Sequence, residues 1–304
     1  MNQYDIIIIG AGPGGLTAGI YAGRQGTKNL IIDKDLAGGL GREVPEMENY
    51  PGFDNISGLE LIDKIKAQAI KNCELHEMEE VLEIIKTDKE WRFEVKTNKD
   101  TYQSKSIILA TGSSHRHLDV KGEEEFKGKG VSYCATCDGF FFAGRDIVMI
   151  GGGNSALQEA LYLKNLGANV TVVHRRNEFR AQKHLQNQIK EANINTILNA
   201  TVEEIKGDML VESIILKDTE TSELREIPTN GVFISAGYIP HTKLAKQLGV
   251  SLDESGHIIT DKNQKTNTDF VYAVGDVCVG LKQWVVACGE GAIAATSAFT
   301  DMQN

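Results

Sequence analysis

The sequence predicts an α/β protein with two Rossmann-like dinucleotide-binding domains, the second inserted into the first. Two apolar runs typical of buried strands, residues 6–9 and 147–150, each end directly at a glycine-rich turn. Each turn precedes an Ala/Leu-rich stretch of helical character and then another β-rich run, at residues 30–32 and 170–173. Because strand, glycine turn, helix and strand recur in the same order, we expect one nucleotide-binding βαβ unit in each copy.

Both copies also carry a later apolar strand that closes on small residues, at 107–112 and 232–237. Too few residues remain after this point for a third sheet, but they include one more buried-strand run, at 270–275. This run could complete the first sheet, and the second unit would then lie inside the first. The predicted domain segments are residues 1–115 and 241–304 for the first domain and residues 116–240 for the second.

Composition narrows the class of partner. The chain has 304 residues with 42 acidic and 32 basic side chains, a formal charge of −10, which argues against nucleic acid as a partner. Residues 6–23 carry no charge, but Pro13 and several glycines break them into strand, turn and helix, so we expect no membrane segment. Five scattered cysteines are too few for a disulfide scaffold, and we expect a cytoplasmic protein.

The first glycine turn, GAGPGG at residues 10–15, has the GxGxxG pattern between a strand and a helix. Gly10 permits a tight turn, Gly12 lets a pyrophosphate approach the backbone, and Gly15 allows close helix packing. About 20 residues further on, Asp33 ends the next strand, where a carboxylate accepts hydrogen bonds from ribose hydroxyls. The predicted contacts of this dinucleotide site are Gly10, Gly12, Pro13, Gly15 and Asp33.

The late strand indicates which dinucleotide this is. Gly275 and Asp276 follow it, in a place where a carboxylate could bind the polyol of a flavin. The next segment, residues 283–299, is Ala-rich with Glu290 as its one charge; the N-terminus of such a helix stabilises negative charge on a reduced flavin ring. These features favour FAD over the alternative of an ordinary C-terminal helix behind an ordinary strand-end Asp.

The second glycine turn, GGGNSA at residues 151–156, predicts contacts from Gly151, Gly153, Asn154 and Ser155. Its following strand ends not in an acid but in basic residues, which are His174, Arg175, Arg176 and, a little further, Arg180. Arginines bind a 2′-phosphate that a carboxylate would repel, so the pattern favours NADPH over NADH. The alternative is a solvated basic cluster.

The pair Cys134 and Cys137, with Asp138 beside it, indicates redox chemistry. A CxxC pair closes to a disulfide or opens to a dithiol, and the adjacent carboxylate could carry protons. A zinc site is the alternative, but no second CxxC or close Cys/His pair supplies the other two ligands.

The other three cysteines and three of the histidines belong to no redox or metal-binding motif in the sequence. Cys73, Cys278 and Cys288 are expected to be core thiols. His76, His115 and His117 have no matching partner in the sequence and are expected to be surface or hinge residues, and residues 119–129 are expected to form a solvated loop.

Several motifs together resemble the low-molecular-weight thioredoxin reductases over nearly the whole chain. They are GAGPGG, ENYPG (48–52), ATG (110–112), CATCDG (134–139), GGGNSA, HRRNEFRA (174–181) and YAVGDV (272–277). The resemblance implies a homodimeric flavoprotein that holds FAD and passes electrons from NADPH to a thioredoxin- or glutaredoxin-like protein. It implies that Cys137 faces the flavin, Cys134 attacks the partner disulfide and Asp138 serves as acid and base.

The resemblance also assigns cofactor contacts. Flavin contacts would come from Asn49, Asp276 and Gln283, with Gly275 and the ATG residues Ala110, Thr111 and Gly112 in the same motifs. Trp284 stands where the family has a small residue beside the flavin. The 2′-phosphate contacts would come from Arg175, Arg176 and Arg180, next to His174.

Other functions stay open at this level. The same disulfide reductase could take electrons from a deazaflavin or a ferredoxin, although the retained GGGNSA and HRR segments favour a nicotinamide. A flavin oxidase or a component of a peroxide-reducing system is a rival enzyme. A flavin redox sensor, in which the cysteine pair switches a partner interaction, is the alternative outside enzymes.

Overall fold

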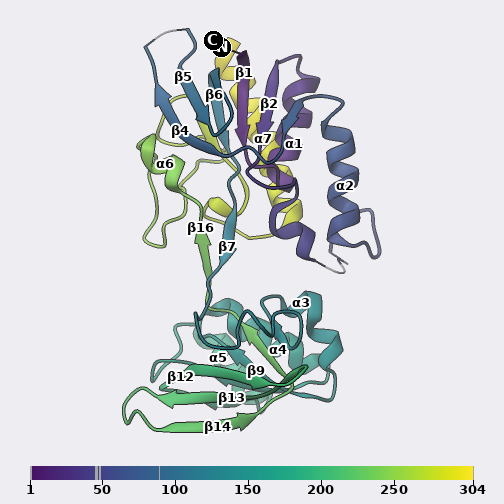
Figure 1. The fold of residues 1–304 in the computed structure, drawn as a ribbon, viewed down its shortest axis with the longest axis vertical. Helices are drawn as coiled ribbons and strands as arrows, with labels where there is room; N and C mark the ends of the chain where they lie inside the picture. Colours follow the sequence, from purple (N-terminus) through teal and green to yellow (C-terminus); the bar gives the residue numbers. More distant parts are fainter. Residues whose placement is uncertain (1, 45–46, 48, 89, 304) are drawn as a thin grey trace. The chain divides into compact units, whose positions relative to one another are not determined.

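The computed structural model describes residues 2–44, 47, 49–88 and 90–303. They form two compact units, Met1–Ser114 with Ile239–Asn304, and His115–Tyr238. The chain leaves the first unit through β7 (Ser113–His115) and returns through β16 (Tyr238–Pro240), and these two strands pair with each other (Figure 1). The second unit is therefore an insertion in the first.

The first unit contains a sheet built on the isoleucine-rich run at the N-terminus. Its strands are β1 (Asn2–Ile9), β2 (Asn29–Ile32), β3 (Glu74–His76), β4 (Val81–Lys86), β5 (Phe93–Thr97), β6 (Thr101–Leu109) and β17 (Val271–Ala273). They run in the order β3-β2-β1-β6-β5-β4, and β17 also pairs with β6. The pairs β3–β2, β2–β1, β1–β6 and β6–β17 are parallel. The pairs β6–β5 and β5–β4 are antiparallel. The late strand thus completes the first sheet, as predicted.

At β1, both faces of this sheet are buried. Ile6 and Ile8 of β1 pack into the core on one face, and Ile7 and Ile9 pack into the core on the other. The continuous apolar run in the sequence reflects this two-sided burial, since a strand covered on one face only would alternate. The elements that cover it are α1 (Pro13–Arg24), α2 (Gly58–Ala69), α6 (Lys243–Gln247) and α7 (Trp284–Gln303), with the 3-10 turns η1 (Gly39–Glu43) and η3 (Gly275–Val277).

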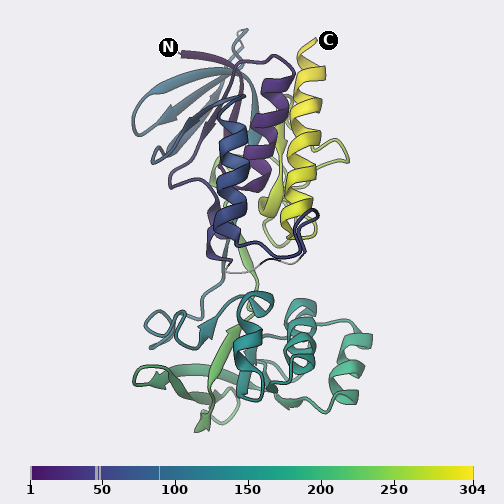
Figure 2. The same cartoon turned by 90° about the vertical axis from the view of Figure 1, so that its right-hand side faces the viewer.

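Helices α2, α1 and α7 lie side by side on one face of the sheet (Figure 2). The closest packing is between α1 and α7, where a Cβ atom on Gly291 would lie 2.2 Å from the carbonyl oxygen of Gly14. Gly14 is also closely packed, though less tightly, because its Cβ would lie 3.1 Å from the carbonyl oxygen of Ala287. Glycine at these positions lets the long C-terminal helix touch the start of α1, directly behind the first glycine turn.

The second unit repeats the parallel arrangement. Five of its strands form a parallel sheet in the order β11-β10-β9-β15-β8. They are β8 (Val131–Ser132), β9 (Asp146–Ile150), β10 (Asn169–Val173), β11 (Asn195–Ile197) and β15 (Gly231–Ile234). A separate antiparallel sheet has the order β12 (Ala200–Gly207), β13 (Val211–Asp218), β14 (Leu224–Pro228). The helical segments are α3 (Ala135–Asp138), η2 (Gly139–Phe142), α4 (Asn154–Asn165) and α5 (Lys183–Glu191).

The two units place their strands in corresponding order around the glycine turns. In each unit, the strand before the glycine turn lies between the strand that follows the helix and a strand from later in the chain. The order is β2-β1-β6 in the first unit and β10-β9-β15 in the second. The predicted fold class, two Rossmann-like domains with one inserted in the other, is confirmed. In the described part of the chain, no helix is long and apolar enough to cross a membrane.

The α1–α7 contact gives a test of the packing. We expect Gly291→Ala to lower the free energy of unfolding by about 1–3 kcal/mol, because the added methyl group meets backbone atoms that cannot rotate away. Gly289→Ala, in the same helix, is the matched control, since its Cβ would meet nothing within 4 Å and alanine favours a helix. Denaturant unfolding followed by circular dichroism measures both, and equal stability of the two variants would contradict the prediction.

Candidate functional site

The first glycine turn joins the carboxyl end of β1 to α1. Gly12 is the N-cap of α1 and Pro13 begins the helix, so no side chain caps its first N–H groups. A Cβ on Gly12 would meet nothing within 4 Å, whereas a Cβ on Gly15 would lie 1.9 Å from the carbonyl oxygen of Gly10. The turn is therefore tightly packed on the sheet side and open in front of the helix. This arrangement fits a pyrophosphate group.

Asp33 lies beside this turn, at the carboxyl end of β2. Its Oδ2 accepts a hydrogen bond from the Ala11 N–H at 2.6 Å, and its Oδ1 accepts one from the Asp35 N–H at 2.9 Å. Burial raises the pKa of Asp33 above its usual value, and these two hydrogen bonds oppose the rise. The structure thus brings Asp33 to the glycine turn, as a ribose-binding role requires.

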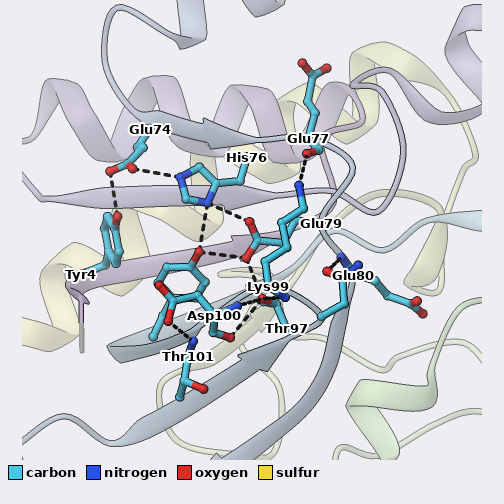
Figure 3. Close-up of polar contacts among 12 residues, drawn as sticks. Tyr4, Glu74, His76, Glu77, Glu79, Glu80, Thr97, Lys99, Asp100 and Thr101 are labelled. Atoms are coloured by element: carbon cyan, nitrogen blue, oxygen red, sulfur yellow. Dashed lines mark hydrogen bonds and ion pairs between the residues drawn. The ribbon is translucent and has the colours of Figure 1, made fainter.

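His76 and Glu79 belong to the polar network that Figure 3 shows, and their backbones also hydrogen-bond to the Asp33 backbone. The Asp33 N–H donates to the carbonyl oxygen of His76 at 2.9 Å, and the Glu79 N–H donates to the carbonyl oxygen of Asp33 at 2.9 Å. Nε2 of His76 lies 2.9 Å from Glu74 Oε1, and its Nδ1 lies 3.1 Å from Oε2 of the buried Glu79. The Tyr102 hydroxyl donates to Glu79 at 2.8 Å. His76 therefore has partners that the sequence did not show, because the β3 edge brings two carboxylates to it.

Two predicted flavin contacts meet in the first unit although the sequence separates them widely. Nδ2 of Asn49 donates to Oε1 of Gln283 at 3.1 Å. The next residue, Trp284, packs against η1, because a Cβ on Gly41 would lie 2.1 Å from its ring. Tyr50 lies edge-on to Trp284, with ring centroids 6.4 Å apart. An amide pair beside two aromatic rings fits the polar edge and apolar face of a planar heterocycle.

Asp276 lies in η3, directly after β17. Burial raises the pKa of its carboxyl above the usual value, and the nearby positive charges of Lys282 and His257 oppose the rise. The N–H of the preceding residue, Gly275, donates to Glu290 Oε2 of α7 at 2.6 Å. Nε2 of His257 is buried without a hydrogen-bond partner among the described residues. A desolvated carboxylate and an unpartnered ring nitrogen at the end of a sheet strand fit a polyhydroxyl ligand.

The ATG segment, residues 110–112, follows β6 and packs against the first glycine turn. A Cβ on Gly10 would lie 2.1 Å from the carbonyl oxygen of Ala110. The Thr111 hydroxyl donates to the carbonyl oxygen of His241 at 2.7 Å, and a Cβ on Gly112 would meet nothing within 4 Å. The structure thus gathers the predicted flavin residues of the first unit around the carboxyl ends of β1, β2, β6 and β17.

The second glycine turn repeats the geometry of the first. Gly153 is the N-cap of α4, and a Cβ on it would meet nothing within 4 Å. The His174 ring covers Gly152, whose Cβ would lie 2.3 Å from the ring Nδ1. Nε2 of His174 is buried and has no hydrogen-bond partner within the described ranges. Asn154, the first residue of α4, accepts a hydrogen bond from the Gln182 N–H at 2.8 Å.

The three predicted arginines belong to the segment that follows β10 and returns to this turn. Arg175 and Arg176 follow β10, and the Arg180 N–H donates to the carbonyl oxygen of Gly152 at 2.9 Å. All three side chains are exposed, and none has an ion-pair partner among the residues that the structure describes. Burial, and then the charges of these arginines, lower the pKa of His174. Unpaired guanidinium groups beside an open helix N-terminus fit a phosphate group.

The cysteine motif lies in the second unit, at the start of α3. Cys134 is disulfide-bonded, and the side chain of Cys137 lies outside the described part of the structure. The Asp138 N–H donates to the carbonyl oxygen of Cys134 at 3.2 Å, and the Asp138 carboxylate accepts a hydrogen bond from Ser132 at 2.5 Å. Among the described residues, no group of three or more His, Cys, Asp or Glu side chains could hold a metal ion.

The other three cysteines are free. Cys278 is buried, and burial raises its pKa above the ordinary value of a thiol. Cys73 is partly buried, and burial raises its pKa to about 11. Cys288 is also partly buried, with its thiol 3.8 Å from the carbonyl oxygen of Pro13. Burial therefore disfavours the reactive thiolate form of Cys73 and Cys278.

The segment before the cysteines is largely exposed, as expected of a solvated loop, but one buried carboxylate anchors it. The Glu123 carboxylate is 3% exposed and accepts hydrogen bonds from the N–H groups of residues 118–120. The Tyr133 hydroxyl donates to Glu123 at 2.6 Å, and Nδ1 of His117 lies 3.5 Å from Glu123 Oε1. His115 stacks on Tyr133 with ring centroids 5.1 Å apart. His117 is exposed, as expected of a surface residue, but both histidines have partners, since His115 stacks on Tyr133 and His117 lies beside Glu123.

Sequence reasoning also missed an exposed aromatic pair. Phe140 and Phe141 follow Asp138 after one glycine, are 55% and 58% exposed, and lie with ring centroids 4.0 Å apart. Exposed aromatic side chains of this size mark interaction surfaces more often than an isolated apolar residue does. The run of three phenylalanines beside the cysteine motif was the available signal.

Two open glycine turns and a disulfide-bonded cysteine define a class of protein in which nucleotide binding is coupled to disulfide chemistry. A family model described as pyridine nucleotide-disulphide oxidoreductase matches residues 4–291. This class implies a flavin and a pyridine nucleotide as cofactors.

Comparison with individual relatives identifies the family within this class. Thioredoxin reductase from Listeria innocua is 43% identical over 97% of this chain and 92% of its own length. Thioredoxin reductase from T. acidophilum has a solved structure with 42% identity and a TM-score of 0.74, covering 100% of both chains. The structure from Streptococcus pyogenes has 38% identity and a TM-score of 0.84, covering 99% of this chain and 98% of that chain. The chain belongs to the thioredoxin reductase family.

One buried carboxyl group near the second turn gives a pH-dependent prediction. Burial raises the pKa of Glu159, in α4, to about 7, and a hydrogen bond from the Ser235 hydroxyl opposes the rise. The folded state therefore binds this proton more tightly than the unfolded state, whose carboxyl has a pKa near 4.5. The contribution of Glu159 to stability is fully present below pH 4.5 and is lost as the pH rises to about 7.

We expect Glu159→Gln to remove this part of the pH dependence and to stabilise the protein above pH 7 relative to the parent. Denaturant unfolding between pH 4.5 and 8 measures the effect. Glu191→Gln, at an exposed position in α5, is the control and should leave the pH profile unchanged. A parallel profile for the parent and Glu159→Gln would contradict the prediction.

Proposed function

We propose that this chain is an NADPH-dependent thioredoxin-disulfide reductase, in which electrons pass from NADPH through FAD and the Cys134–Cys137 pair to a thioredoxin- or glutaredoxin-like protein. The observation that carries the proposal is the disulfide-bonded Cys134 at the start of α3. The same unit contains the second glycine turn and the three arginines that follow β10. Membership in the thioredoxin reductase family supports the same reaction.

In this proposal the first unit is the FAD domain. The α1 N-terminus, with Gly10, Gly12, Pro13 and Gly15, would bind the pyrophosphate, and Asp33 would bind the adenosine ribose. The flavin ring and ribityl chain of FAD would contact residues that follow β6 and β17, residues at the start of α7, and Asn49. These residues are Asn49, Ala110, Thr111, Gly112, Gly275, Asp276, Gln283 and Trp284. FAD, when bound, supplies the two-electron step between the nicotinamide and the disulfide.

The second unit would bind NADPH. The N-terminus of α4, with Gly151, Gly153, Asn154 and Ser155, would hold the pyrophosphate. Arg175, Arg176 and Arg180 would bind the 2′-phosphate, because their charges are unpaired among the described residues and belong to the segment that returns to the open turn. The unpartnered Nε2 of His174 offers a further hydrogen bond to the same group.

The cysteine chemistry then follows from thiol–disulfide exchange. The Cys134 thiolate attacks the redoxin disulfide, which forms a mixed disulfide and releases one redoxin thiolate. The Cys137 thiolate attacks Cys134, which restores the Cys134–Cys137 disulfide and releases the second redoxin thiolate. Asp138 would pass the protons that the enzyme thiols lose to these thiolates, so two electrons and two protons reach the redoxin.

The exposed Phe140–Phe141 pair supports docking of the redoxin in this segment, since it places apolar area next to the cysteines. The proposal also includes the homodimer and the cytoplasmic location that the family resemblance implies. Light scattering of the purified protein tests the dimer, and a mass of one chain would overturn that part.

The donor is tested by anaerobic titration of the flavin-loaded protein with NADPH and, separately, with NADH. We expect flavin absorbance to bleach at much lower NADPH concentration. A flavin that dithionite bleaches but neither nicotinamide reduces would overturn the donor assignment and favour a deazaflavin or ferredoxin.

Arg176 gives a sharper test of the phosphate site. We expect Arg176→Ser to raise KM for NADPH about 10- to 100-fold and to leave KM for NADH unchanged, because it removes a charge-assisted contact to a group that NADH lacks. Arg145→Ser, an exposed arginine of the same unit, is the matched control. Equal changes in KM for both nucleotides would contradict the assignment.

A substitution of Cys134 distinguishes the reduction of the flavin by NADPH from the reduction of the thioredoxin disulfide. We expect Cys134→Ser to abolish thioredoxin reduction while NADPH still bleaches the flavin, since nicotinamide oxidation does not need this sulfur. Cys73→Ser, at a free and partly buried thiol of the first unit, is the control and should keep turnover. Thioredoxin-coupled NADPH oxidation and stopped-flow flavin absorbance measure the two halves, and catalytic disulfide reduction by Cys134→Ser would contradict the proposal.

A further inference from the structure

Ser132 is a buried polar residue next to the cysteine motif, and the proposed reaction does not yet use it. It ends β8 and is 5% exposed. β8 pairs in parallel with β15, with Ser132 opposite Phe233, so the backbone of Ser132 belongs to the rigid sheet of the second unit. Cys134 and α3 follow it directly. Ser132 is thus the last sheet residue before the redox segment.

The Ser132 hydroxyl makes three contacts within this short segment. Its oxygen lies 2.5 Å from Oδ2 of Asp138 and 3.3 Å from the carbonyl oxygen of Cys134. It also accepts a hydrogen bond from the Cys134 N–H at 3.1 Å. A hydroxyl has a single proton to donate, and a charged acceptor at the shorter distance takes it. Ser132 therefore donates to Asp138 while it accepts from Cys134.

These bonds close a ring between the cysteine and the carboxylate. The Asp138 N–H donates to the carbonyl oxygen of Cys134 at 3.2 Å, so backbone and side chain of Asp138 both return to the same segment. Among the described residues, the Asp138 carboxylate has no other hydrogen-bond or ion-pair partner. Without the Ser132 hydroxyl, no group that the structure describes would fix the rotamer of Asp138.

We propose that Ser132 is a positioning residue that holds the Asp138 carboxylate at the redox cysteines for proton transfer during thiol–disulfide exchange. The inference rests on the proposed function, in which Asp138 is the acid and base. Ser132 itself exchanges no proton with the redoxin. It acts through Asp138, because a proton-transfer group must stay within hydrogen-bond reach of the sulfur that it serves.

A double-mutant cycle tests this inference on the flavin-loaded enzyme, with a bacterial thioredoxin as substrate and NADPH as donor. We expect Ser132→Ala to lower kcat about tenfold, with KM for NADPH and the rate of flavin bleaching by NADPH unchanged. In the Asp138→Asn background, the same substitution should cause no further loss, because the group that it positions is already disabled. Losses that multiply in the double variant would overturn the inference.

A pair of variants of equal size guards against a folding defect. Ser132→Thr keeps the hydroxyl and should retain kcat, whereas Ser132→Val replaces it with a methyl group and should behave like Ser132→Ala. Equal kcat for the Thr and Val variants would also overturn the inference.

Ser213 supplies a matched control within the same unit. It is a largely buried serine that donates to Glu226 at 2.5 Å, remote in sequence from the cysteines. Ser213→Ala should therefore leave kcat unchanged, and a tenfold loss there would show that the Ser132 effect is a general loss of stability. If Asp138→Asn alone keeps full kcat, the acid–base role of Asp138 in the proposed function fails, and the inference about Ser132 fails with it. A loss in Asp138→Asn that Ser132→Ala multiplies overturns only the inference.

Discussion

Backbone packed directly against backbone at the two glycine turns is the constraint on which the remaining architecture depends. A Cβ on Gly15 would lie 1.9 Å from the carbonyl oxygen of Gly10, and one on Gly10 would lie 2.1 Å from that of Ala110. This packing fixes the start of α1 at the carboxyl end of the sheet. The uncapped N–H groups of the helix therefore face the edge where the ends of β2, β6 and β17 also lie, which makes a single site out of distant segments.

The second unit applies the same constraint with different electrostatics. Its open turn at Gly153 corresponds to the turn at Gly12, but arginines stand where the first unit has Asp33. Because the acidic residue pairs with a backbone N–H and the arginines have no described acidic partner, one turn suits a ribose diol and the other a phosphate. In the proposed function, the same backbone geometry would serve two different nucleotides through a few side chains at the strand ends.

Outside the turns, buried carboxylates organise the irregular segments. Glu79 anchors the segment that holds Asp33, Glu123 collects the N–H groups of residues 118–120, and Glu290 accepts from the Gly275 N–H. The buried Glu79 and Glu123 each have several donors, as a buried charge requires. Loops that lack regular hydrogen bonding thereby keep the fixed geometry that a cofactor site needs.

The sequence by itself determined the fold class, the two glycine turns and the cysteine motif. These are local patterns, in which neighbouring residues dictate strand, turn and helix. It also indicated the arginine cluster, since those side chains follow one strand. Only the tertiary structure decided the pairing of Asn49 with Gln283, the carboxylates around His76 and the burial of Glu123. The first two contacts join different elements and the third depends on packing around a loop, so periodicity and spacing contain no signal for them. Ser132 lies between these cases: it is close to Asp138 in sequence, but its contact exists because β8 ends where α3 begins.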